Sequence, residues 1–243
     1  MKCHMIFDIK MGENFRQRDR MMAGGHTTTA PAGMTYSSVV SGNSMRIALT
    51  IAALNDIEVM ACDINNAYLT SKFQEKIWTI AGPEFLSESR QPMIVVRELY
   101  GIKSSGAAFW ALLAETLNDL GYNPSFADQD VWIRAAVKPC IFKYYDLILC
   151  YVHDVLTVSH DTMKTMNVIR SNFTLKDDKF EKPNIYLGAS LDKMPTADGV
   201  ECWTMLPEKY CKADVQNVKK VLKNHGQRLP SKCRAPLKPG YRP

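Results

Sequence analysis

The sequence of 243 residues contains no uninterrupted apolar run that approaches the roughly 18 residues needed to cross a membrane. Its first residues, Met1 to Lys10, include no hydrophobic stretch of the kind that signal peptides carry. Internal repeats and low-complexity tracts are absent as well. We therefore expect a protein that works inside the cell without a membrane partner, and we exclude a repeat architecture.

Closely spaced cysteine pairs are also missing. The seven cysteines form no CxxC motif and are odd in number: Cys3, Cys62, Cys140, Cys150, Cys202, Cys211 and Cys233. This pattern argues against a disulfide scaffold and against a zinc module. We therefore interpret the seven cysteines as reduced thiols of an intracellular protein.

The overall composition is that of an ordinary globular protein. Hydrophobic residues make up 46% and charged residues 23% of the chain, which argues against disorder. A chain of this length can bury one sizeable core, or one core and a smaller subdomain. The 30 basic and 25 acidic residues give a net charge of +5. This balance is compatible with nucleic-acid binding but does not establish it.

Apolar residues at helical spacing predict four helices. They are expected at about residues 44–54, 105–120, 162–173 and 207–224. Ser44 or Asn43 is the expected cap of the first helix, and Ser104 or Ser105 that of the second. Gly121 should end the second helix in a left-handed conformation.

Short β-rich segments predict strands between these helices. They are expected at residues 57–64, 76–80, 93–99, 131–134, 184–191 and 201–205, with two more short strands within residues 8–15. Residues 24–33 are expected to form a loop, and the basic tail 228–243 is expected to fray. Because helices and strands are mixed and hairpin connections occur, the predicted class is α+β.

The segment from Asp146 to Ser159 is the most informative. Two apolar runs flank the polar pair His153-Asp154, which predicts a hairpin with this pair at its turn. Another aspartate, Asp63, lies near the end of an earlier predicted strand. Carboxylates held at the ends of buried strands suit Mg²⁺, which prefers oxygen ligands. Aspartate is also common in turns, so a solvated turn remains the alternative for both residues.

Five ordered blocks resemble the reverse transcriptases of copia-type retrotransposons. The first is DINNAYL at residues 63–69, similar to D-V/I-x-N-A-F/Y-L. The second is RELYGIK at residues 97–103 with Phe109-Trp110, similar to LYGLKQAPRAW. The others are Gly121-Tyr122 with ADQD at 127–130, YVHDVL at 151–156, similar to YVDD followed by I, M or L, and FTLKD at 173–177 with YLG at 186–188. Each block alone would be a weak signal, but their common order makes the resemblance specific.

The resemblance implies a right-hand polymerase with a palm of antiparallel sheet and packed helices. It implies partial fingers at residues 1–55, a palm with inserted fingers elements at 56–195, and the beginning of a thumb or connection with a frayed basic tail at 196–243. The implied partners are an RNA or DNA template-primer and deoxynucleoside triphosphates, with other retroelement proteins as further candidates. The implied cofactors are two Mg²⁺ or Mn²⁺ ions, and the implied location is a cytoplasmic particle or the nucleus.

The family's site residues carry over to matching positions of this chain. Asp63 matches the first metal-binding aspartate, and Asp154 matches the second member of the hairpin's aspartate pair. Tyr68 matches the aromatic residue beneath the incoming sugar, which excludes a ribose 2′-hydroxyl, with a core aromatic as the alternative. Three basic residues match positions near the nucleotide, with solvated surface as the alternative: Arg18, Arg20 and Lys103.

The hairpin departs from the family pattern at its first aspartate, which is His153 here. An imidazole offers one softer nitrogen in place of a charged carboxylate, and it suits Zn²⁺ or Cu²⁺ better than Mg²⁺. Because metal ions supply several kcal/mol of transition-state stabilisation, we expect polymerase activity to be severely reduced. Gly106 also replaces a family proline, and Asp19 interrupts the basic fingers stretch. The absence of protease, integrase and RNase H portions predicts a fragment of an element polyprotein.

Three functions remain open from the sequence. They are an RNA-directed DNA polymerase dependent on Mg²⁺, a non-enzymatic remnant that keeps weak nucleic-acid binding, and an unrelated α+β domain. A separation of more than about 10 Å between the carboxyl groups of Asp63 and Asp154 would exclude a shared dinuclear site. A metallohydrolase cluster of His153, Asp154 and His160 is disfavoured, because their spacing does not direct three ligands at one centre.

Overall fold

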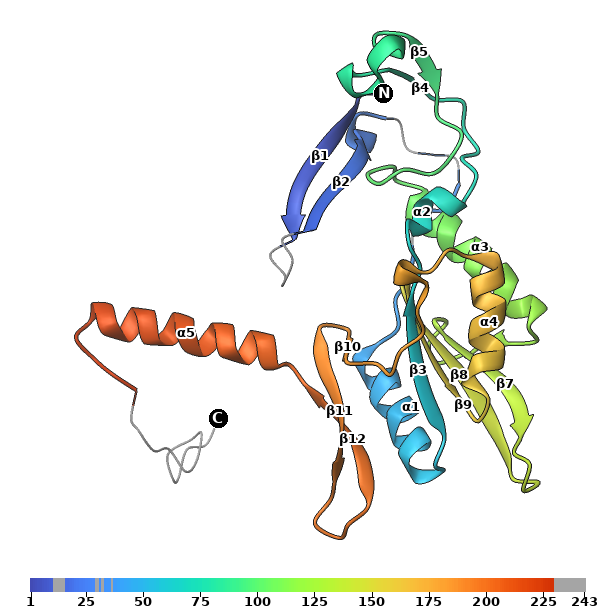
Figure 1. Cartoon of the computed structure of the whole chain (residues 1–243), viewed down its shortest axis with the longest axis vertical. Coiled ribbons are helices and arrows are strands. Elements are labelled where there is room, and N and C mark those ends of the chain that lie inside the picture. Colours follow the sequence, from blue (N-terminus) through green and yellow to red (C-terminus); the bar gives the residue numbers. More distant parts are fainter. Residues whose placement is uncertain (11–15, 29–30, 32, 36, 230–243) are drawn as a thin grey trace.

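The computed structural model of the chain describes residues 1–10, 16–28, 31, 33–35 and 37–229. Within that part, five strands form a central antiparallel sheet in the order β3–β9–β8–β7–β6 (Figure 1). The strands are β3 (Glu58–Asp63), β6 (Asn123–Pro124), β7 (Val131–Val137), β8 (Lys143–Tyr151) and β9 (Asp154–Ser159). The mixture of helices with antiparallel sheets agrees with the predicted α+β class, and β8 and β9 form the predicted hairpin.

Helices cover both faces of this sheet, and the sheet separates the core into two clusters. α3 (Ser105–Asp119) and α4 (Thr162–Asn172) contribute to the cluster on one face, and α1 (Gly42–Leu54) contributes to the cluster on the other. Successive residues of a strand point to opposite faces. Ile148 therefore packs in the first cluster and Leu149 in the second, and both are fully buried.

A smaller antiparallel sheet packs beside α1. It consists of β10 (Ile185–Tyr186), β11 (Ala189–Pro195) and β12 (Glu201–Leu206), and α5 (Glu208–Asn224) projects from its end (Figure 1). The prediction of one strand over residues 184–191 was wrong. Leu187 and Gly188 adopt positive φ values of 51° and 73° and turn the chain between β10 and β11.

Two hairpins lie at the other end of the molecule (Figure 1). They are β1 (Cys3–Lys10) with β2 (Arg16–Ala23), and β4 (Trp78–Ile80) with β5 (Pro92–Ile94). The two strands were expected within residues 8–15, but β1 begins earlier, at Cys3, and β2 begins only at Arg16, so their predicted positions were wrong. Residues 11–15 lie outside the described part. The strand expected at 93–99 is limited to β5. Short helical turns connect these elements: η1 (Gly25–Thr27), α2 (Ala67–Thr70), η2 (Pro83–Glu88) and η3 (Lys176–Asp178).

The cap of α1 differs from the predicted Ser44 or Asn43, whereas that of α3 is the predicted Ser104 without a capping hydrogen bond. Ser41 caps α1, because its hydroxyl oxygen accepts the amide hydrogen of Ser44 at 3.1 Å. Ser104 occupies the N-cap position of α3, but its hydroxyl donates to the carboxylate of Glu98 and makes no capping hydrogen bond. The buried carboxylate of Glu98 therefore binds the hydroxyl that would otherwise cap α3. Among the described helices, none combines the length and the apolar composition that crossing a bilayer requires.

Candidate active site

The side chains of Asp63 and Asp154 meet at one end of the central sheet. Asp63 at the end of β3 is paired in register with Asp154 at the start of β9. The turn that precedes Asp154 contains Val152, whose φ is +55°, a costly conformation for a β-branched residue. The amide of Ile64 donates to the carbonyl of His153 at 2.9 Å, which ties this turn to the chain that follows β3.

Asp63, His153 and Asp154 form a compact cluster of candidate ligand atoms. One such atom from each residue lies within 4.8 Å of the others. Nε2 of His153 is 3.9 Å from Oδ1 of Asp63, and both side chains are partly exposed to solvent. The carboxyl groups are therefore much closer than the separation of about 10 Å that would exclude a shared site.

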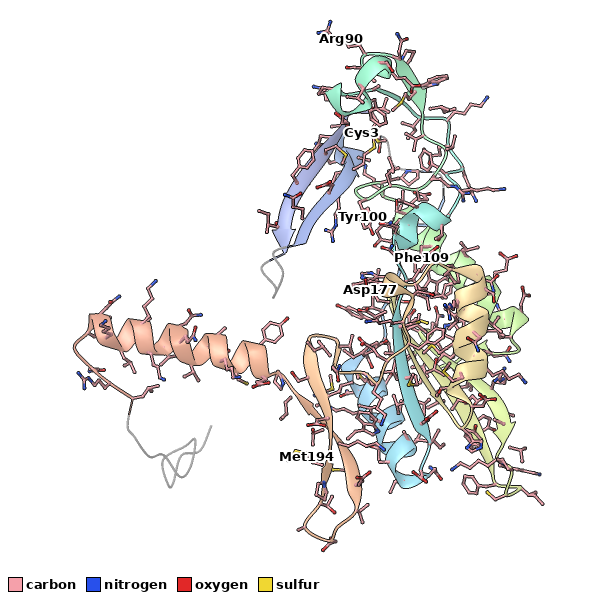
Figure 2. The ribbon with its side chains drawn as sticks, viewed as in Figure 1. Cys3, Arg90, Tyr100, Phe109, Asp177 and Met194 are labelled. Carbon is pink, nitrogen blue, oxygen red and sulfur yellow. The ribbon has the colours of Figure 1, made fainter. Side chains whose placement is uncertain are left out.

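Lys176 adds a positive charge to this cluster, and sequence reasoning assigned it no role. Its Nζ donates to Oδ2 of Asp63 at 2.8 Å. Lys176 begins η3, and a β-bridge between Ile64 and Leu175 brings this segment to the end of β3. Its neighbour Asp177 marks this end of the sheet in Figure 2. The available signal in the sequence was the position of Lys176 in the FTLKD block.

Burial and neighbouring charges determine the protonation of these groups. Burial raises the pKa of the Asp154 carboxyl. His153 and Lys176 oppose this increase in the pKa, whereas the charge of Asp63 adds to it. Burial, together with Asp63 and Asp154, raises the pKa of the neighbouring Cys62 thiol to about 12. Cys62 therefore stays a neutral thiol, the form that does not bind metals.

A polar cleft of about 230 Å³ opens beside the two aspartates. The segment after α4 provides its opposite wall, with Lys176, Lys179 and Glu181 among the lining residues. The carboxylates of Asp63 and Asp154 therefore face a recess that a small charged ligand can enter. This placement argues against the alternative in which both aspartates only form solvated turns.

Two of the predicted nucleotide-binding residues, Tyr68 and Arg20, lie beside the ring of Tyr100. The ring centroids of Tyr68 and Tyr100 are 4.9 Å apart, and Cζ of Arg20 lies 5.5 Å from the Tyr100 centroid. Tyr68 is half-buried, and its ring also packs against Phe109 at 6.3 Å. Burial raises the pKa of its hydroxyl. Tyr100 and Phe109 lie beside α2, which carries Tyr68 (Figure 2). Tyr68 thus contributes to the core while keeping part of its surface exposed.

The remaining candidates lie apart from the aspartate cluster. Nζ of Lys103 donates to the carbonyl of Thr28 at 2.8 Å, so it holds the segment that follows β2. The backbone of Arg18 pairs with Asp8 in β1, but its side chain lies outside the part that the structure describes. His160 follows the end of β9 opposite to Asp154, and the described cluster of metal-binding groups does not include it.

Comparison with known proteins gives consistent matches. A family model described as reverse transcriptase (RNA-dependent DNA polymerase) matches residues 4–218. The retrovirus-related Pol polyprotein from transposon RE1 of Arabidopsis thaliana is 25% identical over 204 residues, covering 80% of this chain and 13% of the relative. The one from transposon TNT 1-94 of Nicotiana tabacum is 23% identical over 187 residues, covering 73% and 14%. The transposon Ty1-NL2 Gag-Pol polyprotein of Saccharomyces cerevisiae is 26% identical over 184 residues, covering 72% and 10%. The chain thus spans only 10% to 14% of the length of these relatives.

Proposed function

Because this chain belongs to the reverse transcriptase (RNA-dependent DNA polymerase) family, we propose that it extends DNA primers on a template and that this activity is severely impaired. The family match confirms the resemblance to copia-type reverse transcriptases and removes the unrelated α+β domain from consideration. The proposed substrates are deoxynucleoside triphosphates and an RNA or DNA template-primer. The proposed impairment comes from His153, which stands where the family has a carboxylate.

We assign residues 56–195 to the palm, 1–55 to partial fingers and 196–243 to the beginning of a thumb or connection. The antiparallel central sheet with α3 and α4 on one face supports the palm assignment. The hairpin β1–β2 at the opposite end from β11 and β12 supports the fingers assignment (Figure 1). α1 packs against the central sheet, so this helix would support the palm although it precedes residue 56.

The observation that carries the proposal is the pairing of Asp63 with Asp154. These residues are 91 positions apart in the sequence (154 − 63), yet the ladder between β3 and β9 places them directly opposite each other. Reverse transcriptases as a family use divalent metal ions, and two carboxylates at neighbouring strand ends are suitable ligands for them.

The donor set does not fit two Mg²⁺ ions. Mg²⁺ requires oxygen ligands in a near-octahedral arrangement, and the third donor of this cluster is an imidazole nitrogen of His153. Two dications would bring four positive charges to two carboxylates, and the carboxylate of Asp63 already pairs with Lys176. Asp177, Lys179 and Glu181 line the same cleft, so the imidazole of His153 is the feature that disfavours two Mg²⁺ ions and supports reduced turnover.

Other residues retain features that suit a nucleotide. In the proposed site, the exposed part of Tyr68 contacts the sugar of the incoming nucleotide. Arg20, held over Tyr100, contributes positive charge near the phosphates, since guanidinium groups bind phosphate oxygens well. We thus expect this chain to retain nucleotide binding although most of its catalytic activity is lost.

The second candidate function is a remnant that binds nucleic acid without any turnover. The ion pair between Lys176 and Asp63 favours it, because the ammonium group lies 2.8 Å from Oδ2 of Asp63, where a metal ion bound to this oxygen would lie. Such a protein would bind template-primer weakly and with strong salt dependence.

Primer extension with the full chain separates these two functions. The assay uses an RNA homopolymer template with a DNA primer, Mg²⁺, and the native protein beside the variant His153→Asp. We expect little incorporation by the native protein and a gain of at least about 100-fold in His153→Asp, equivalent to about 2.7 kcal/mol of transition-state stabilisation.

His160→Asp is the matched control, because it makes the same change of charge at an exposed residue outside the cluster. It should leave incorporation at the native level. Robust incorporation by the native protein would refute the proposed impairment. Undetectable incorporation by both the native protein and His153→Asp, with template-primer binding intact, would favour the remnant.

A further inference from the structure

One donor atom of the aspartate cluster, the imidazole nitrogen of His153, differs in kind from those that bind Mg²⁺. Asp63 comes from the end of β3, Asp154 from the start of β9, and His153 from the turn between β8 and β9. Each residue offers one ligand atom within 4.8 Å of the others. Two donors are hard carboxylate oxygens and the third is an imidazole nitrogen. Imidazole favours transition metals such as Co²⁺, Ni²⁺ and Zn²⁺, whereas Mg²⁺ prefers a shell of oxygen.

The distance between the donor atoms of His153 and Asp63 suits a single ion. Ligand atoms bound at about 2.1 Å to one ion lie roughly 3 to 4.2 Å from one another. The distance of 3.9 Å between Nε2 of His153 and Oδ1 of Asp63 falls within this range. The ladder pair Asp63–Asp154 and the hydrogen bond from Ile64 to the His153 carbonyl fix the backbone around these groups.

A cation of the chain itself already occupies one side of this cluster. The ammonium group of Lys176 lies 2.8 Å from Oδ2 of Asp63, while the other oxygen, Oδ1, faces His153. The two carboxylates carry two negative charges, and Lys176 offsets one of them. The remaining charge of these two carboxylates favours a single dication. Asp177, Lys179 and Glu181 line the same cleft but lie outside the cluster of candidate ligand atoms.

Sulfur is not part of this donor set. Cys62 precedes Asp63 on β3, so its side chain points to the opposite face of the sheet. There it is buried in the core cluster with Ile148 and Val155.

We propose that Asp63, His153 and Asp154 bind one first-row transition-metal ion such as Co²⁺, Ni²⁺ or Zn²⁺ in preference to Mg²⁺, an inference that rests on the proposed function in taking this cluster as the divalent-metal site. A set of one imidazole and two carboxylates leaves coordination positions open to water or to a phosphate oxygen. Lys176 competes with the ion for Asp63.

Titration of the full chain with Co²⁺, followed by its visible d–d absorption without nucleotide or template, tests this site. We expect one equivalent of Co²⁺ to bind and to resist displacement by an excess of Mg²⁺ of about 100-fold. His153→Asn removes the imidazole without adding charge and should weaken Co²⁺ binding at least about 10-fold. His153→Asp adds a hard carboxylate and should make Mg²⁺ an effective competitor. Lys176→Gln should strengthen Co²⁺ binding, because it frees Oδ2 of Asp63.

His160→Asp is the control and should bind Co²⁺ as the native protein does. Unchanged Co²⁺ affinity in His153→Asn, equal affinity of the native protein for Mg²⁺, or a sulfur-to-cobalt charge-transfer band would each overturn the proposal. Should His153→Asn lose its circular dichroism spectrum, His153→Gln replaces it with the same expected loss of Co²⁺ affinity. Because no polymerisation is measured, the titration gives its answer whether or not primer extension succeeds.

Discussion

Single residues in this chain stabilise buried charge by two different means. Asp146 on β8 is nearly inaccessible and receives a hydrogen bond from Arg134 on β7 at 2.8 Å. Arg134 also donates to the carbonyl of Leu120 at 2.9 Å. Glu98 is equally buried but accepts hydrogen bonds from the hydroxyls of Ser104 and Ser105. The first carboxylate depends on an ion pair, whereas the second depends on neutral donors.

Replacing Arg134 by Met should lower the free energy of unfolding by about 3 kcal/mol, because it leaves the carboxylate of Asp146 buried without its partner. Urea denaturation of the native protein and the variant measures this difference. Arg46→Met is the matched control, since Arg46 is exposed on α1 and bonds to Asn43. It should change the free energy by less than about 0.5 kcal/mol. Equal effects of the two substitutions would contradict the role given to Arg134.

Glu98→Gln should become increasingly stabilising as pH rises from about 4 to 7. Burial raises the pKa of Glu98 above its unfolded value, although Ser105 and Ser104 partly oppose this increase. The native fold therefore favours the protonated carboxyl, and this contribution is fully present below the unfolded pKa of about 4.3. It is lost as pH rises through the folded pKa. Glutamine avoids that loss because it does not ionise.

Thermal unfolding of both proteins at several pH values measures this effect. The exposed Glu115 of α3 provides the control, and Glu115→Gln should show a nearly constant difference in melting temperature. A pH-independent difference for Glu98→Gln would contradict the assignment of a buried, ionisable carboxylate.

At the site itself, sequence reasoning identified residues but not their partners. Asp63 and Asp154 were recognised by the identities of their neighbours, and the structure places them opposite each other. The contact of Lys176 with Asp63 could not be predicted, because it depends on how the chain after α4 folds back. The β-bridge between Ile64 and Leu175 sets that path, and its two residues are far apart in the sequence.

At the level of elements, the hairpin β1–β2 is attached to the rest of the chain through a close backbone contact. The amide of Ala23 donates to the carbonyl of Tyr100 at 2.7 Å. Gly101 follows with φ +92°, and a Cβ atom added there would lie 2.2 Å from the Ala23 carbonyl oxygen. Glycine is therefore required at this position both for its conformation and for the space that it leaves.

Gly101→Ala should weaken the contact between Ala23 and Tyr100. It should lower the free energy of unfolding by more than left-handed backbone strain alone would. Gly199 makes the matched comparison, because its φ is +78° and a Cβ atom there would meet nothing within 4 Å. Gly199→Ala should cost about 1–2 kcal/mol from its backbone conformation, and Gly101→Ala should cost at least about 1 kcal/mol more from the clash. Denaturant unfolding of the two variants gives the comparison, and equal costs would show that the contact is unimportant.

Elements with a strong local pattern could be predicted, whereas short ones could not. The long helices followed from apolar spacing, and Gly121 ends α3 at φ +79° as expected. β6 has two residues, too few to show any periodicity. The turn between β10 and β11 relies on Leu187 at positive φ, a conformation that the identity of leucine does not suggest.

On the scale of the whole molecule, burial is distributed unevenly. Strands β8 and β9 supply fully buried residues to both core clusters, Ile148 and Leu149 from β8 and Val155 and Leu156 from β9. α5 is exposed along nearly all of its described length. The central sheet pairs β3 with β9, two segments about 90 residues apart in the sequence. Local sequence patterns cannot predict such a pairing, whereas the family resemblance implied an antiparallel palm sheet.

This uneven burial predicts two regimes of hydrogen exchange. Isolated helices of about 15 residues are marginally stable in water, so the amides of Val215 and Val218 in α5 should exchange through local opening. Those of Leu149 and Leu156 should require global unfolding and exchange at least about 1,000-fold more slowly. Mass spectrometry of peptides from both regions measures the ratio, repeated at a lower protein concentration. Protection of α5 that equals the protection of β8 and β9 at both protein concentrations would contradict this prediction and show that the helix is stable alone. Protection of α5 that disappears on dilution would instead show that a second copy of the chain covers it, because only association depends on concentration.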